Sequence, residues 1–383
     1  MLNKFSCVFY FLVLIFVMHT SAYSADRYWV GGGSTSDWNA VGNTNWSATS
    51  GGANNASVPT SSDNVYFDSN SGVGTSVLSA NITIRSLNCT GFTGTLQHDA
   101  AVTLSIGDAT PGAGIIALKF VAGMTYTIGN ATSSAISFIS GSSNYSTVAQ
   151  VVDFSGKTTG NLTFNNSSGS WLFQGVHNTS AATTITLTAG TLNTNGFAVS
   201  WGIFTSGGGT LTLGSSTVTI TGVGTVWNCA ATLTANTSTI IVNDATVAAK
   251  TFAGAGKTTY NNVTFSGDNI TITGANTFLG TFSVNNAGLA TGLKLTSGVT
   301  QTITLFATNG SSGNLAKLLS SVGASAATMT KASGIVTADY LSIQDITAAT
   351  AGTATWYAGA NSTNVSGNTG WIFTAPIVRY WVG

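Results

Sequence analysis

The sequence predicts an all-β protein folded as a right-handed parallel β-helix, a β-solenoid in which short strands wind around one axis. Short segments such as 184–188 and 217–221 alternate threonine with isoleucine, leucine or valine, which is the period of a strand with one buried face. Turn residues, for example Asn195-Gly196, separate these segments. Strong helix formers are scarce, since glutamate is absent and only 6% of the 383 residues are charged.

Segments with this strand period follow one another along most of the chain. They are 81–85, 102–106, 125–128, 184–188, 210–213, 217–221, 239–242, 270–273 and 302–305. Each has one apolar face and one hydroxyl-rich face, so none can bury its apolar face alone. Stacked coils of roughly 20–25 residues would bury all of these faces. An array of antiparallel β-sandwiches gives the same alternation and is the second architecture that we consider.

Internal repeats favour the solenoid. Residues 154–164 resemble residues 256–265, and both segments contain Gly-Lys-Thr-Thr followed by a strand ending in phenylalanine. More loosely, residues 135–141 resemble residues 316–323. Coils wound on one axis are expected to stack like residues above like. The second match also predicts that the segment around Leu315 is a strand rather than a helical turn.

The first 24 residues have the features of a secretory signal peptide. Lys4 precedes an apolar run, residues 5–18, and small residues lead to Ala25. This run is shorter than a comfortable membrane span. We therefore expect a secreted or cell-surface protein, with an uncleaved anchor as the alternative. Cys89 and Cys229 remain in the mature chain, and we expect them to be two free, buried thiols.

Two copies of one aromatic pentapeptide divide the rest of the chain. Residues 27–31 read Arg-Tyr-Trp-Val-Gly, and residues 379–383 read the same. We predict a tryptophan-rich N-terminal capping segment at 25–68, in which Trp29, Trp38 and Trp46 cover the open end of the stack. The solenoid itself is placed at 69–373. Residues 374–383 are interpreted as a linker and the start of a truncated next repeat.

A family resemblance rests on both ends of the chain. The opening 27–68 contains Arg-Tyr-Trp-Val-Gly, Trp-Asn, Asn-Trp-Ser, Val-Pro and Asp-Asn-Val-Tyr-Phe-Asp, and the ending 338–373 contains Ala-Asp-Tyr-Leu-Ser-Ile-Gln-Asp and Gly-Trp-Ile-Phe. These motifs resemble large repetitive secreted proteins of bacteria and bacteriophages, which are similar to parallel β-helix adhesins and to phage fibre or tail proteins. The resemblance implies a surface-exposed binding or structural role. It brings no catalytic residues with it.

Composition and motifs point away from several functional classes. The formal net charge is zero, so no basic surface for nucleic acid is expected, and contact with a membrane is expected only through the signal peptide or an anchor further downstream. Lys257 lies in a Gly-Lys-Thr-Thr segment, but the spacing and the following strand do not fit a phosphate loop. His98-Asp99 lacks an accompanying nucleophile motif. We predict a non-enzyme without cofactors.

The predicted binding residues are aromatic. Aromatic rings on an uncharged β surface can stack on sugars while asparagine and threonine bind the hydroxyl groups. The residues selected for this role are Trp171, Trp201, Trp227, Trp356 and Tyr357. The alternative is that these aromatic rings fill the interior of the coils. Asp63 and Asp68 flank a short strand and are weak candidates for binding calcium, with turn capping as the alternative.

These observations predict a secreted or cell-surface, adhesin-like repeat protein. Its rod would display binding residues at fixed spacing, so that many weak contacts to glycans or other surface molecules add up. A bacteriophage fibre or tail protein that binds a receptor is the first alternative. A polysaccharide-degrading β-helix enzyme is the second.

Overall fold

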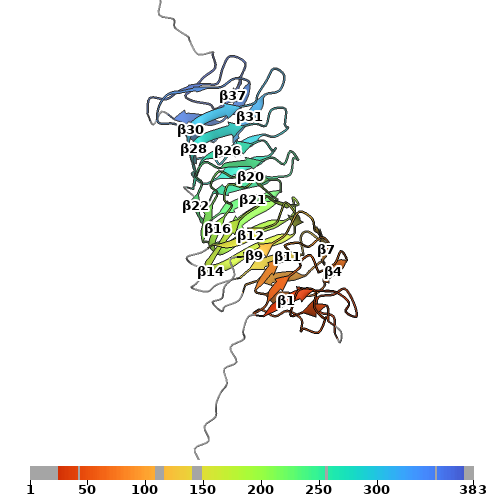
Figure 1. The fold of residues 1–383 in the computed structure, drawn as a ribbon. Helices are drawn as coiled ribbons and strands as arrows, with labels where there is room; N and C mark the ends of the chain where they lie inside the picture. The colour runs from red at the N-terminus through yellow and green to blue at the C-terminus, as the bar shows by residue number, and fades with distance from the viewer. Residues whose placement is uncertain are drawn as a thin grey trace, which may run out of the picture.

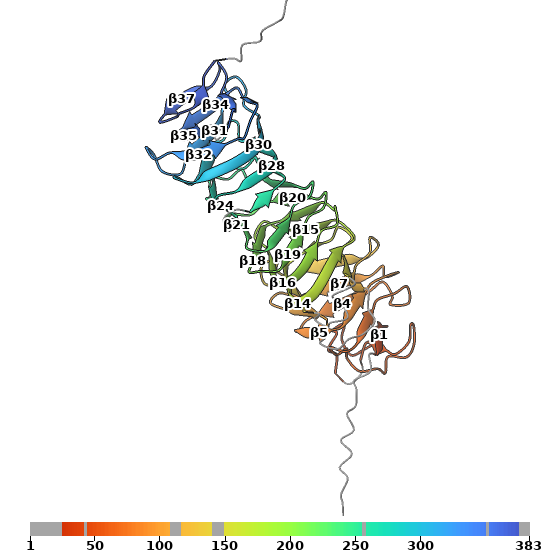
Figure 2. The same cartoon turned by 90° about the vertical axis from the view of Figure 1, so that its left-hand side faces the viewer.

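The computed structural model describes residues 25–41, 44–107, 116–139, 149–254, 258–349 and 352–374. Within these ranges the protein is all-β and contains no helix, and stacked parallel strands form a β-solenoid of about 13 turns. At ~4.8 Å per turn the rod is about 60 Å long, and Figures 1 and 2 show it as one elongated stack. The predicted signal peptide and the second pentapeptide lie outside the described residues.

Each turn of the N-terminal and middle parts passes through three faces in the same order. The strands of the first face are β1 (Asp26–Trp29), β3 (Asn64–Tyr66), β6 (Ser86–Asn88), β9 (Ile116–Lys119), β12 (Gln150–Asp153), the ends of β14 (Asn161–Phe173) and β16 (Thr184–Asn193), β19 (Thr210–Thr212) and β22 (Thr232–Thr234). Neighbouring strands in this series are parallel.

The second face consists of three groups of parallel strands. At the N-terminal end are β4 (Thr75–Leu78), β7 (Thr95–His98) and β10 (Thr125–Ile128). They are followed by β13 (Thr158–Thr159), β15 (His177–Thr179), β17 (Val199–Trp201), β20 (Thr217–Ile220), β23 (Thr239–Val242), β26 (Asn262–Phe265) and the second halves of β28 (Thr277–Val284) and β30 (Thr300–Thr308). The first halves of β28 and β30 form a separate series with β25 (Thr259–Tyr260), β32 (Ala327–Thr330) and β35 (Ile346–Ala349), which takes the place of the first face in the C-terminal turns. A C-terminal sheet contains β33 (Ile335–Thr337), β36 (Thr355–Tyr357) and β38 (Trp371–Ile372).

The third face is the longest series and runs almost the whole rod. Its strands are β5 (Ile82–Ile84), β8 (Thr103–Ile106), β11 (Ala135–Phe138), the beginnings of β14 and β16, β18 (Ile203–Ser206), β21 (Gly224–Cys229), β24 (Lys250–Gly254), β27 (Ile270–Thr273), β29 (Leu293–Leu295), β31 (Ala316–Ser320), β34 (Leu341–Gln344) and β37 (Thr363–Ser366). Because successive side chains of a strand point to opposite faces of the sheet, every second residue enters the interior.

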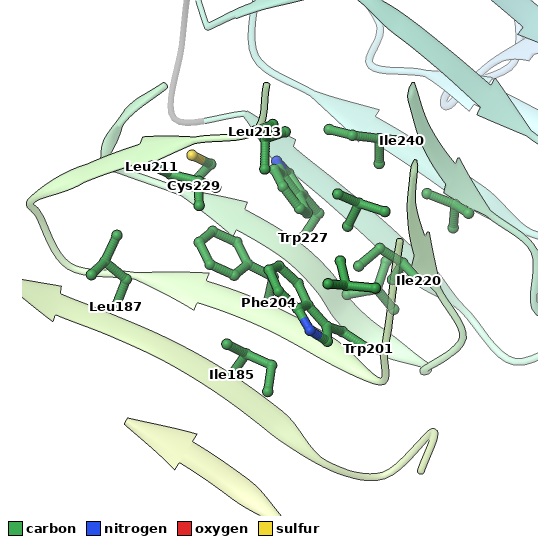
Figure 3. Packing of buried hydrophobic residues seen from close by; sticks show 14 of the residues in the cluster. Ile185, Leu187, Trp201, Phe204, Leu211, Leu213, Ile220, Trp227, Cys229 and Ile240 are labelled. Atoms are coloured by element: carbon green, nitrogen blue, oxygen red, sulfur yellow. The ribbon is translucent and has the colours of Figure 1, made fainter. Parts of the chain in front are cut away.

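The interior is a set of apolar rows that run along the axis. On the third face one row contains, from turn to turn, Leu162, Ile185, Phe204, Trp227 and Phe252, which are partners in the strand pairing and are fully buried. Figure 3 shows part of this row between the strands of neighbouring faces. Each side chain covers the one below it, so the hydrophobic surface is removed from water by stacking rather than by the packing of two separate sheets.

The structure confirms the solenoid and excludes the sandwich array. All pairings between the named strands of the described part are parallel except that of β1 with β2 (Trp46–Ser47). Predicted strands 125–128, 239–242 and 270–273 coincide with β10, β23 and β27. Residues 316–320 form β31, as the repeat predicted. Several hydrogen bonds to side chains on the adjacent turn join residues 22 to 25 positions apart, in the range expected for one coil.

The stacking predicted for the clearest repeat is wrong. Both copies form two short strands in succession, β13 and the start of β14 in one, β25 and β26 in the other. However, β14 begins on the third face, where it pairs with β11, whereas β26 pairs with β23 on the second face. The repeated sequence therefore specifies a local bend between two strands. It does not specify the face on which they lie.

An aromatic cluster covers the N-terminal end of the stack. Trp38 and Trp46 are fully buried and meet edge to face, with ring centroids 5.3 Å apart. Phe67, on the following turn, lies 5.5 Å from Trp38. The indole nitrogen of Trp38 donates to Ser76 Oγ at 2.7 Å, and that of Trp46 donates to the carbonyl oxygen of Trp38 at 2.8 Å. The polar edges of both rings are thus satisfied in the interior.

Cys89 and Cys229 are free and buried, as predicted. Burial raises the pKa of both thiols, and that of Cys229 rises to about 11. Both thiols are therefore protonated near neutral pH and act as small apolar side chains. Separately, none of the residues that the structure describes belongs to a helix of the length and apolarity needed to span a membrane.

Stacking as the source of stability gives a prediction for Trp227. We expect Trp227→Ala to lower the free energy of unfolding by about 3–5 kcal/mol, because it leaves a cavity between two buried aromatic rings. Thr205→Ala, at an outward position on the adjacent turn, should change it by less than about 0.5 kcal/mol. Urea unfolding followed by circular dichroism measures both. Similar losses for the two variants would contradict the role of the interior rows.

Candidate functional site

The tryptophans that the sequence analysis selected for binding lie in the interior. Trp171, Trp201 and Trp227 are 0% exposed and Trp356 is 1% exposed. Their rings belong to the apolar rows, so no sugar can stack on them from outside. The predicted ligand-binding role is therefore wrong for these four residues, and the alternative, that they fill the coils, is correct. A parallel solenoid has one continuous interior, and large aromatic rings are the side chains that best fill its width.

Two of these tryptophans have polar partners inside the core. The Trp201 indole nitrogen donates to His177 Nδ1 at 3.1 Å, so His177 carries its proton on Nε2, which lies 2.9 Å from Thr159 Oγ1. The Trp227 indole nitrogen donates to the hydroxyl group of Tyr260 at 3.2 Å. Such fully paired polar groups fix the alignment of successive turns without a charge.

Neither histidine in the described part is positioned for catalysis. His98 is 1% exposed, with Nδ1 2.7 Å from the hydroxyl group of Tyr126 and Nε2 2.9 Å from the carbonyl oxygen of Val102. Burial lowers the pKa of His98, and it lowers the pKa of His177 to about 3. Both rings are neutral at physiological pH and serve as hydrogen-bonding members of the interior.

The two weak calcium candidates cap turns. Asp63 is 3% exposed, and its Oδ2 accepts hydrogen bonds from the backbone nitrogen and the hydroxyl group of Thr60, at 2.8 and 2.9 Å. Asp68 Oδ1 accepts a hydrogen bond from the backbone nitrogen of Asn70 at 2.9 Å. Among the described residues, no group of three His, Cys, Asp or Glu side chains is arranged to hold a metal ion. These contacts are those of turn-capping aspartates.

The outer surface carries the remaining predicted binding residue and a second aromatic feature. Tyr357, in β36, is half-buried, so it stays available as a predicted binding residue. A more prominent pair, which was not among the residues predicted from the sequence, is Tyr28 of β1 and Tyr66 of β3. These residues are partners in the strand pairing, and their rings stack at 4.8 Å with an interplanar angle of 16°. Both are partly exposed. Their positions follow from alternation, because Trp29 and Val65 point inward.

Polar side chains surround the tyrosine pair on the same face. Asn88 follows Tyr66 on the next turn, and Lys119 and Asp153 continue the row. In the neighbouring row, Asn64 donates to Asp26 Oδ1 at 3.1 Å and Ser86 donates to Asn64 Oδ1 at 2.9 Å. We call the outward residues Asp26, Tyr28, Asn64, Tyr66 and Asn88 the tyrosine surface.

Both phenols of the tyrosine surface are neutral at physiological pH. Burial raises the pKa of Tyr28 and of Tyr66 above the ordinary value of 10.0, and the carboxylate of Asp26 raises both further. A neutral phenol both donates and accepts hydrogen bonds, and its ring offers an apolar surface. The surface can therefore stack on a flat, hydroxyl-bearing ligand and also bind its hydroxyl groups.

Comparisons of the chain with protein-family models, with curated proteins and with solved structures find no match.

The buried histidine gives a prediction for pH dependence. The pKa of His177 is about 3 in the folded protein against 6.5 for an unperturbed histidine. Between these values the unfolded chain binds a proton that the folded chain does not, so stability should fall as the pH drops from 6.5 towards 3. His177→Gln should weaken this acid sensitivity, although it lowers stability at pH 7. The urea unfolding midpoints of both proteins at pH 7 and pH 4.5 measure this acid sensitivity. If the midpoint falls equally between the two pH values in the wild type and in His177→Gln, His177 is not the source of the acid sensitivity.

Proposed function

We propose that this protein is a secreted or cell-surface, adhesin-like repeat module whose rod displays glycan-binding side chains for multivalent attachment. The observation that carries the proposal is the tyrosine surface. It combines a stacked aromatic pair with amide, hydroxyl and carboxylate groups, which is the set of groups that sugars require. A flat outer face of this kind suits weak, reversible contact with a polymer rather than enclosure of a small substrate.

The rest of the rod supports the same proposal. On the third face the outward positions of successive turns form a row in the pairing register: Thr83, Ser105, Ser137, Thr163, Thr186, Thr205 and Asn228. These side chains are small, uncharged and partly exposed. Such a surface is soluble without attracting ions, and its groups recur at ~4.8 Å along the axis. Weak contacts at this fixed spacing add up along an extended ligand.

A binding assay with surface variants tests the proposal. The purified module is applied to immobilised neutral and acidic polysaccharides, and retention is compared with that of Tyr28→Ser/Tyr66→Ser. We expect at least a tenfold loss of affinity in the double variant, because stacking on each tyrosine ring is removed while the inward side chains are unchanged. The matched control is Ser200→Ala/Thr219→Ala, two outward residues on adjacent turns of the second face, which should bind within twofold of the wild type.

Several outcomes would contradict the proposal. Failure of the wild-type module to bind any polysaccharide or glycosylated cell surface would count against a glycan adhesin. Equal loss in the control variant would place binding elsewhere on the rod. Release of shortened oligosaccharides during the incubation would instead favour the polysaccharide-degrading alternative. A stable trimer that binds one bacterial receptor would favour the phage-fibre alternative.

A further inference from the structure

The N-terminal cap contains a cleft that shares no residue with the tyrosine surface. It has a volume of about 540 Å³ and lies between two loops, residues 30–36 after β1 and residues 71–75 before β4. Its lining includes Ser34, Thr35, Ser36, Asn45, Gly74 and Thr75. This volume is within the range of roughly 300–1,000 Å³ that is typical of small-molecule sites.

Hydrogen bonds within the protein hold both loops that form the walls of the cleft. Asn45 is 1% exposed and holds the first loop with three hydrogen bonds of 2.8 Å, from the backbone nitrogen of Gly33 and to the carbonyl oxygens of Thr35 and Asp37. On the other wall, Ser71 Oγ accepts a hydrogen bond from the backbone nitrogen of Asp68 at 2.9 Å. The cleft is therefore formed before a ligand arrives, which lowers the entropic cost of binding.

The glycines in the lining keep the cleft open. Gly31 and Gly72 have φ angles of +66° and +73°, which other residues rarely adopt. Gly74 is different, because its φ angle is ordinary and a Cβ atom added to it would have no protein atom within 4 Å. Neither the φ angle nor the space around position 74 excludes a larger side chain there, so this position is suited to obstructing the cleft experimentally.

The chemistry of the lining selects the ligand. None of the lining residues is charged, so a phosphate, a carboxylate or a cation would have no counter-charge there. The side chains of Ser34, Thr35 and Ser36 are exposed and supply hydroxyl groups, whereas the Trp29 ring is 4% exposed and belongs to the core. A neutral, hydroxyl-rich ligand fits this combination.

We infer that the cleft between residues 30–36 and 71–75 is a binding site for one end of a neutral glycan. The inference rests on the proposed function, since it assigns a subsite and a ligand charge to the glycan binding proposed above. The tyrosine surface would contact the side of a chain, and the cleft would accept its terminal sugars.

Filling the cleft tests the inference. We expect Gly74→Leu to weaken the binding of cellotriose, maltotriose or triacetylchitotriose at least tenfold in calorimetric titration, because Gly74 lines the cleft and a Cβ atom added to it meets no protein atom, so a larger side chain takes up space that the ligand needs. Gly207→Leu is the matched control, since Gly207 also has an ordinary φ angle and no atom near an added Cβ, and it should bind within twofold of the wild type. Thr75→Val, which removes one hydroxyl group at nearly constant volume, should weaken binding severalfold.

The outcomes test the cleft separately from the proposed function. Loss of trisaccharide binding in Gly74→Leu, with an unchanged unfolding midpoint, supports the site; if that variant misfolds, Thr75→Val decides in its place. Unchanged binding in both variants, together with loss in Tyr28→Ser/Tyr66→Ser, overturns the cleft and leaves the proposed function standing. Binding of acidic glycans only also overturns the cleft. Absence of any glycan binding by the wild-type protein overturns both.

Discussion

The contact between successive turns is the constraint on which the rest of the structure depends. A single turn exposes one side of its apolar residues, and only the next turn covers them. The parallel backbone ladder sets the distance between turns, and in-register pairing places each inward side chain directly over its partner, as with Phe204 over Ile185. Because stability accumulates from neighbour to neighbour, the two ends need separate treatment. At the N-terminal end the rings of Trp38 and Trp46 cover the apolar side of the first turn.

The same constraint explains why most polar chemistry in this chain is structural. Inward histidine and tyrosine side chains must be neutral and paired, as His177 is with Trp201, because an unpaired charge inside the stack would be costly. Aspartates at the corners, such as Asp63, bind backbone groups of turns. The residues left for recognition are those that alternation places outside, together with loops that are not needed to close a turn.

The fold could be predicted from local patterns, because alternation and turn residues act over a few positions. Residues 125–128 and 239–242 were identified with correct bounds for this reason. The face occupied by a repeat could not be predicted. The bend after Thr159 and the bend after Tyr260 are alike in sequence, but their faces depend on the summed lengths of all the preceding turns. A short repeat carries no information about that sum.

The binding residues were harder to predict than the fold. Tryptophan was selected for its ring, but the width of the interior makes the largest rings the best filling, and Trp171 and Trp227 are buried for that reason. The period-two rule places Tyr28 and Tyr66 outside once Trp29 and Val65 are assigned to the core. Their stacking, however, requires the register of β1 on β3. The cleft depends on two loops, residues 30–36 and 71–75, that are separated in the sequence, and no local sequence pattern marks it.

The register between turns can be measured directly by cysteine cross-linking. Thr186 and Thr205 are outward partners on adjacent turns, and at ~4.8 Å their Cα atoms lie within disulfide range. We predict that Thr186→Cys/Thr205→Cys oxidises rapidly to an intramolecular disulfide, whereas Thr186→Cys/Ile203→Cys, displaced by two residues, does not. Rapid oxidation of the displaced pair, or of neither pair, would contradict the stacked parallel solenoid.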